Sequence, residues 1–210
     1  FVLQMLREYL TFLSRNYTLS ALGPEFTAKY TRGIGQILVE QDKQRFHGLD
    51  VASVINAASD AISDKGGYQL HPEALLRAEQ NLRMAELQRL FAQCGLSGVE
   101  AWINSHPEVA SFFASESRLS ETASSELKQI VEYRNEAAHG DVDDVLGSEV
   151  LAEFTLFFEA LCRSIVDFIQ YDTLRRAKAL GRATVIGVIS ERFQEDIVVA
   201  KIADATLSIG

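Results

Sequence analysis

Apolar residues along most of this chain recur three and four positions apart, which is the spacing that places them on one face of an α-helix. The longest such pattern predicts one helix from Ser148 to about Leu180, ended by Gly181. The apolar side chains expected to point inward from it are Val150, Leu151, Phe154, Phe157, Phe158, Leu161, Ile165 and Ile169. Further helical segments are predicted at residues 2–15, 24–39, 50–62, 99–103, 108–113 and 120–138, and in a stretch that starts at His71-Pro72-Glu73 and ends at Gly95.

The end of the chain has strand character instead. Residues 184–189 and 196–202 are β-branched runs separated by a short polar turn, and residues 206–209 are expected to begin a third strand. Two or three strands alone are marginally stable in water, so this hairpin must either pack on the helices or open a small β domain that continues past Gly210. We favour the second interpretation.

The sequence therefore predicts a mainly α fold with two parts, a helical bundle domain over residues 1–180 and a short β-hairpin segment over residues 182–210. A length of 210 residues, with 47% hydrophobic and 23% charged residues, is enough for one well-filled core. Phe1 reads as part of a helix already in progress, so the helical domain is expected to be truncated at its N-terminus.

The sequence lacks several features that mark common classes of protein and binding site, and this narrows the possible functions. No apolar run approaches the roughly 20 residues that span a bilayer, and the start is not a signal peptide, so we expect a cytoplasmic protein without membrane contact. Cys94 and Cys162 are not spaced as a redox or zinc pair, and we expect neither a metal nor a cofactor. His71 and His106 each precede a proline and are interpreted as turn residues. Gly33-Ile34-Gly35 lacks the context of a phosphate loop and is expected to allow close helix packing.

The net charge of −9 argues against indiscriminate binding of nucleic acid, which depends on neutralisation of phosphates by Lys and Arg. Basic residues are nevertheless gathered in two places, at residues 175–182 and along one predicted helical segment as Arg77, Arg83 and Arg89. Any contact with RNA is therefore expected to be local.

The most informative segment runs from Arg134 to Gly140. Arg134 falls on the apolar stripe of its predicted helix, four positions after Ile130. A guanidinium is always charged and is rarely centred on a packing face unless a partner or a ligand meets it there. Asn135 adjoins Arg134, and His139 follows at the helix end beside the glycine. An arginine and a histidine together at a helix end are suited to chemistry at a phosphate.

The same residues also admit a purely structural interpretation. Arg134 would then pair with Glu132 or Glu136 on its own helix, and His139 would interact favourably with the helix dipole. Spacing alone does not decide between the two interpretations. The position of Arg134 on the apolar stripe favours the functional one.

An arginine, a polar residue, three further residues and a histidine within a helical domain make this chain resemble the HEPN superfamily. The longer segment from Ile130 to Asp141 is similar to the form found in predicted ribonucleases of bacterial conflict systems. In that group the motif follows several helices and precedes one long apolar helix, as the pattern at residues 148–180 does here. The likeness covers roughly residues 1–180 and implies a HEPN-like helical bundle.

The resemblance implies a metal-independent endoribonuclease that cleaves RNA as a homodimer, in the role of a toxin or anti-phage effector with an antitoxin or other regulatory partner. Its catalytic residues would be Arg134, Asn135 and His139. His139 would be the general base for attack by the ribose 2′-OH, Arg134 would hold the phosphate, and Asn135 would orient either group. The alternative is a non-catalytic HEPN-like module that dimerises or binds a nucleotide or a protein, which the acidic composition favours.

Overall fold

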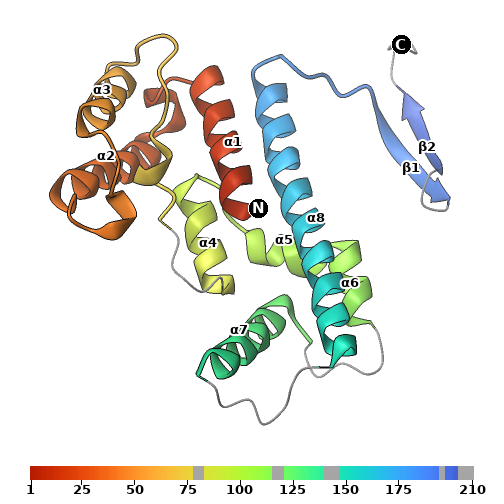
Figure 1. The fold of residues 1–210 in the computed structure, drawn as a ribbon. Helices are drawn as coiled ribbons and strands as arrows, with labels where there is room; N and C mark the ends of the chain where they lie inside the picture. The colour runs from red at the N-terminus through yellow and green to blue at the C-terminus, as the bar shows by residue number, and fades with distance from the viewer. Residues whose placement is uncertain (78–82, 115–120, 140–146, 194–196, 203–210) are drawn as a thin grey trace. The chain divides into compact units, whose positions relative to one another are not determined.

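The computed structural model describes residues 1–77, 83–114, 121–139, 147–193 and 197–202, and these residues form eight α-helices and one two-stranded sheet (Figure 1). The helices are α1 Val2–Asn16, α2 Pro24–Val39, α3 Val51–Ile62, α4 Met84–Gln93, α5 Val99–Ser105, α6 Pro107–Phe113, α7 Ala123–His139 and α8 Ser148–Ala179. Single 3₁₀ turns lie at η1 Ser20–Leu22, η2 Gln44–Phe46 and η3 Pro72–Ala74, and the strands are β1 Gly187–Phe193 and β2 Ile197–Ile202. The predicted mainly α fold is confirmed.

Local signals in the sequence set several of these helix ends. Pro24 opens α2, where its fixed φ and missing N–H suit the first helical position. The Asp50 carboxylate accepts hydrogen bonds from the backbone N–H groups of Ala52 and Ser53, at 3.2 and 3.1 Å, and so caps α3. Gly181, with φ of +68°, follows the end of α8.

Some predicted elements begin or end at other residues in the structure. His71-Pro72-Glu73 begins only the single turn η3, because Ala74, Leu75 and Leu76 are buried in succession, which one face of a helix cannot provide. The next helix starts anew at Met84. Strand β1 begins at Gly187, three residues later than expected, and the predicted third strand lies outside the described residues.

The chain divides into two compact units, Phe1–Ile169 and Gln170–Gly210. In the second unit β1 and β2 pair antiparallel, from Gly187 opposite Ile202 to Phe193 opposite Ile197, with an irregularity between Ile189 and Glu191. A domain boundary near residue 180, and a small β domain built on this hairpin, stay predictions.

The core of the first unit is assembled on one side of α8. Phe157 is fully buried and packs on Phe112 of α6, with ring centroids 5.4 Å apart. Phe168 packs on Trp102 of α5 at 5.4 Å and on Phe91 of α4 at 5.8 Å. Four helices are therefore joined through two rings of α8.

The other side of α8 is less covered than the sequence predicts. Leu151 and Phe158 are 53% and 39% exposed, although the apolar pattern places both in the core. The recorded ring contacts of α8 with α4, α5 and α6 all use Phe157 and Phe168, so only one side of the helix is packed. The expectation that these two side chains point inward within one chain is wrong.

Gly33 allows the close approach that its sequence context predicts. A Cβ atom on Gly33 would lie 1.8 Å from the carbonyl oxygen of Ala74, so α2 meets η3 backbone to backbone. Gly35 does not share this role, because a Cβ atom there would have nothing within 4 Å. Of the two glycines, only the first is required by packing.

The two glycines form a matched pair for a stability test. Gly33→Ala should destabilise the chain by about 3 kcal/mol, because the backbone at Ala74 must move. Gly35→Ala should stabilise it by about 0.5–1 kcal/mol, because alanine favours a helix interior over glycine. Urea unfolding of both variants measures the difference, and equal effects of the two substitutions would contradict the backbone contact.

Candidate active site

The helix that carries the predicted site residues, α7, starts at a reciprocal cap. The backbone N–H of Ser125 donates to Oγ1 of Thr122, and the backbone N–H of Thr122 donates to Oγ of Ser125, both at 3.2 Å. Each side chain thus satisfies a backbone donor of the first turn. The cap explains why α7 begins at Ala123 rather than at residue 120, where the sequence pattern places its start.

One face of α7 packs against the rest of its unit. Leu127 and Val131 are buried, Ile130 is partly buried, and α7 contacts α4. Toward the other end of the helix, Tyr133 packs on Phe154 of α8 with ring centroids 5.9 Å apart. The first two-thirds of the motif helix are therefore held by α4 and α8.

Arg134 lies just beyond this packed portion. It is seven residues after Leu127, so helical geometry places both on the same side of α7. Yet the Arg134 side chain is exposed, whereas Leu127 is buried. The inward direction of the stripe is confirmed at Leu127 and Val131, and Arg134, three positions after Val131, has an exposed side chain.

The other two predicted residues share the same end of α7. Asn135 is partly buried, and His139 is the last residue of the helix, with a side chain outside the described set. Five residues at 100° each separate Arg134 and His139 by about 140° around the axis. A regular helix therefore does not aim both side chains at one atom.

Two glutamates lie close to Arg134 in the sequence of α7. Glu132 is exposed and pairs with Lys128, with Nζ and Oε1 3.7 Å apart. Glu136 is exposed two positions after Arg134, on another side of the helix. The acidic group Asp141, Asp143 and Asp144 lies outside the described residues.

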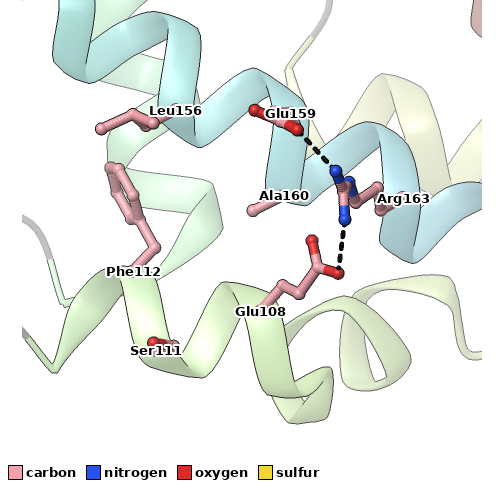
Figure 2. Close-up of a pocket in the computed structure, with 7 residues that line it drawn as sticks. All are labelled: Glu108, Ser111, Phe112, Leu156, Glu159, Ala160 and Arg163. Atoms are coloured by element: carbon pink, nitrogen blue, oxygen red, sulfur yellow. Dashed lines mark hydrogen bonds and ion pairs between the residues drawn. The ribbon is translucent and has the colours of Figure 1, made fainter. Parts of the chain in front are cut away.

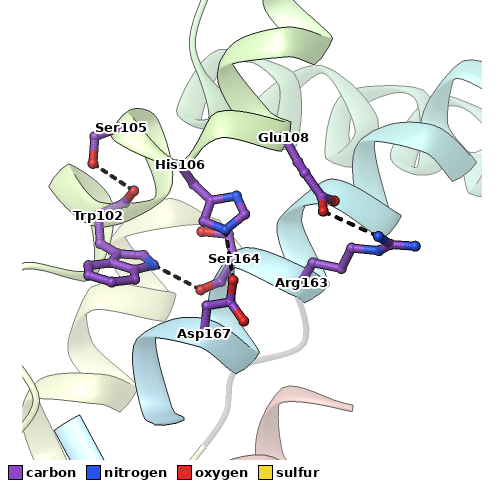
Figure 3. A network of polar contacts seen from close by, with 7 residues as sticks. All are labelled: Trp102, Ser105, His106, Glu108, Arg163, Ser164 and Asp167. Atoms are coloured by element: carbon purple, nitrogen blue, oxygen red, sulfur yellow. Dashed lines mark hydrogen bonds and ion pairs between the residues drawn. The ribbon is translucent and has the colours of Figure 1, made fainter. Parts of the chain in front are cut away.

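A second histidine, His106, has a role that the sequence does not reveal. Its ring is 9% exposed, and its Nε2 lies 3.1 Å from Oδ2 of Asp167 on α8 (Figure 3). Beside it, Nε1 of Trp102 donates to the backbone oxygen of Ser164 at 3.0 Å. Ser164 is completely buried and its Oγ has no hydrogen-bond partner among the described residues, so it is not paired with a base. This network joins α5 and α6 to α8.

A cavity of about 390 Å³ lies between α6 and α8 (Figure 2). The Arg163 guanidinium crosses it and binds Glu108 at 3.2 Å and Glu159 at 2.7 Å. Both carboxylates are thus already paired with a permanent cation, and the three residues form a link between the two helices. We assign no chemistry to this cavity.

The described residues offer no other obvious catalytic group. Among them, no three His, Cys, Asp or Glu side chains are grouped as metal ligands. Burial raises the pKa of the Cys94 thiol to about 12, which keeps it protonated and unreactive. In the same part of the chain no helix has the length and apolar character needed to cross a membrane.

Comparison with known proteins gives one match. A family model described as RiboL-PSP-HEPN matches residues 7–171, which include the whole of α7 and the part of α8 that packs on it. No curated protein and no solved structure matches. The matched region ends before the β-hairpin.

The exposure of Arg134 predicts how its replacement affects stability. Arg134→Met should change the free energy of unfolding by less than about 1 kcal/mol, because exposed ionic contacts contribute little. Leu127→Ala on the same side of α7 should cost about 2–5 kcal/mol, because that side chain is buried. A loss of about 3–5 kcal/mol in Arg134→Met would instead indicate a buried ion pair.

Proposed function

The chain belongs to the RiboL-PSP-HEPN family, and we propose that it is a metal-independent endoribonuclease whose catalytic residues are Arg134, Asn135 and His139. The observation that carries the proposal is the position of Arg134, which lies on the packing side of α7 and has an exposed side chain. An exposed guanidinium next to an amide and a histidine is accessible to a phosphate. Family membership supports the proposal, because HEPN domains are often ribonucleases.

The proposed reaction is an intramolecular transesterification of RNA. His139 takes the proton from a ribose 2′-OH, and the oxygen attacks the adjacent phosphorus. The bond from phosphorus to the 5′-oxygen breaks, and the leaving oxygen takes a proton from the His139 of a second copy of the chain. Arg134 binds the phosphate oxygens and stabilises the additional negative charge, while Asn135 orients the histidine or the phosphate. The products are a 2′,3′-cyclic phosphate and a 5′-OH end.

Two copies of the chain are part of this proposal. Within one α7 the side chains of Arg134 and His139 point about 140° apart around the helix axis. Two motifs that face each other across a two-fold axis can bring an arginine and a histidine to one phosphate more easily than a single helix can. The exposed apolar side chains on α8, including Leu151, Leu156 and Phe158, supply surface for such an interface. We propose a homodimer in which the two motifs meet.

The family type also suggests the biological setting. A ribonuclease of this kind suits a toxin or anti-phage effector in the cytoplasm, held inactive by an antitoxin or another regulatory partner. The second candidate function is a non-catalytic module that dimerises or binds a nucleotide or a protein. The net charge of −9 favours this candidate, because an acidic surface repels RNA.

Cleavage assays separate the two candidates. The chain should cleave RNA in the presence of EDTA, and His139→Ala and Arg134→Met should each reduce the rate by at least about 100-fold. The substitutions must leave the melting temperature unchanged within a few degrees for the result to count. Cleavage by folded His139→Ala at the wild-type rate would contradict the assignment and favour the non-catalytic module.

The dimer is tested by cross-linking. Ala137 is exposed on α7 between Arg134 and His139, so Ala137→Cys should form a disulfide-linked dimer under mild oxidation if the motifs of two copies meet. Ala52→Cys, exposed on α3, is the matched control and should remain largely unlinked. Equal cross-linking of the two variants, or a monomer by light scattering at micromolar concentration, would contradict the composite site.

A further inference from the structure

Three arginines from different parts of the first unit form a cluster away from the motif. Arg45 lies in η2, Arg77 follows η3, and Arg89 lies on α4. Arg89 connects two of them directly, because its guanidinium donates a hydrogen bond to the backbone oxygen of Arg77. We call Arg45, Arg77 and Arg89 the arginine cluster.

Two members of the cluster have carboxylate partners. Arg89 donates to both oxygens of Glu86, at 2.8 and 2.6 Å, and the Glu86 side chain is buried. Arg45 pairs with Glu40 and also lies over the ring of Phe46, 4.8 Å from its centroid. These contacts fix the two guanidinium groups in place.

Arg77 differs from both. Its Nε is buried and has no hydrogen-bond partner, and no carboxylate pairs with its guanidinium among the residues that the structure describes. Burial lowers the pKa of Arg77, and the positive charges of Arg45 and Arg89 lower it further, against a smaller opposite effect of Glu40. A buried donor without an acceptor destabilises a fold, as does repulsion between like charges. An anion bound by the guanidinium groups would offset the repulsion between their charges.

We propose that the arginine cluster binds a phosphodiester of the RNA substrate at a distance from the cleaved bond, an inference that rests on the proposed ribonuclease function. A phosphate offers several acceptor oxygens that planar guanidinium groups can share. Arg77 supplies a guanidinium that no carboxylate pairs with among the described residues, and Arg89 of α4 holds the backbone of Arg77. Helix α4 also packs on α7, so neighbouring elements of one unit carry the cluster and the motif.

The cluster also explains how an acidic chain can bind RNA. A net charge of −9 gives no general attraction to phosphates, so affinity must come from a few fixed contacts. Arg163, in contrast, is held between Glu108 and Glu159 (Figure 2). Arg77 lacks this neutralisation within the described residues. It is therefore the guanidinium best suited to take a phosphate.

The test measures binding without cleavage, in the background of His139→Ala. Fluorescence anisotropy with a labelled short single-stranded RNA should show that Arg77→Gln weakens binding about 5- to 10-fold and lowers the salt dependence of log K by about one unit. Arg163→Gln removes the same charge from a paired site and should leave the affinity unchanged within about 2-fold. Equal RNA affinities for the His139→Ala chain with and without Arg77→Gln would overturn the proposal.

Folding is checked in the same samples. Arg77→Gln should melt at the same temperature as its parent or higher, because it relieves repulsion within the cluster. If this variant fails to fold, Arg45→Gln replaces it, because that side chain is 45% exposed and its replacement leaves the core intact. The same 5- to 10-fold loss of RNA affinity is then expected, and its absence would again overturn the proposal.

Two further arms separate the possible outcomes. A labelled DNA of the same sequence should also depend on Arg77, because a phosphate contact does not require the 2′-OH. AMP should compete only weakly; competition by AMP as effective as that by RNA would indicate a mononucleotide site and overturn the RNA assignment.

The arginine cluster and the ribonuclease activity can fail separately. Arg77-dependent binding of RNA by a wild-type chain that cleaves no RNA would support the proposed role of the arginine cluster and contradict the proposed ribonuclease function. RNA cleavage by a chain whose RNA binding does not depend on Arg77 would support the ribonuclease function and contradict the role of the arginine cluster.

Discussion

Packing on the inner side of α8 organises the first unit. Phe157 and Phe168 contact rings on α4, α5 and α6, and Phe154 contacts Tyr133 on α7. One helix thereby sets the position of four others, including the helix of the motif. The recorded contacts of α7 with α4 and α8 use its buried stripe and Tyr133, and the exposed Arg134 follows directly after Tyr133.

Helix ends and types were largely predictable because they depend on neighbouring residues. Pro24, the cap at Asp50 and Gly181 act within a few positions of the chain, and each gave the correct boundary. The sequence does not predict that the helical segment expected at His71 ends after one turn. The residues after Pro72 are buried in succession because they contact α2, and helical spacing does not reveal this contact. The predicted start of strand β1 is three residues too early, because no residue there marks the beginning of the strand as sharply as Pro24, Asp50 and Gly181 mark helix ends.

The environment of each candidate site residue was less predictable. Helical spacing places Arg134 on the side of Leu127, but spacing does not predict that the Arg134 side chain is exposed, because exposure depends on the other elements that pack on α7. His106 has the sequence context of a turn, yet its ring is buried against Asp167, sixty-one positions away. The arginine cluster was visible only in part, because Arg45 joins Arg77 and Arg89 through the fold and not through any helical spacing.

The central claim is that the 2′-OH of RNA is the nucleophile at a site made of Arg134 and His139. It is tested most directly by the chemistry of the product ends, determined by mass spectrometry after incubation of the chain with RNA in EDTA. The account predicts 2′,3′-cyclic phosphate and 5′-hydroxyl ends, and no cut where the ribose before the scissile phosphate is replaced by 2′-deoxyribose. Ends with 3′-hydroxyl and 5′-phosphate, or cleavage at the deoxy position, would contradict it.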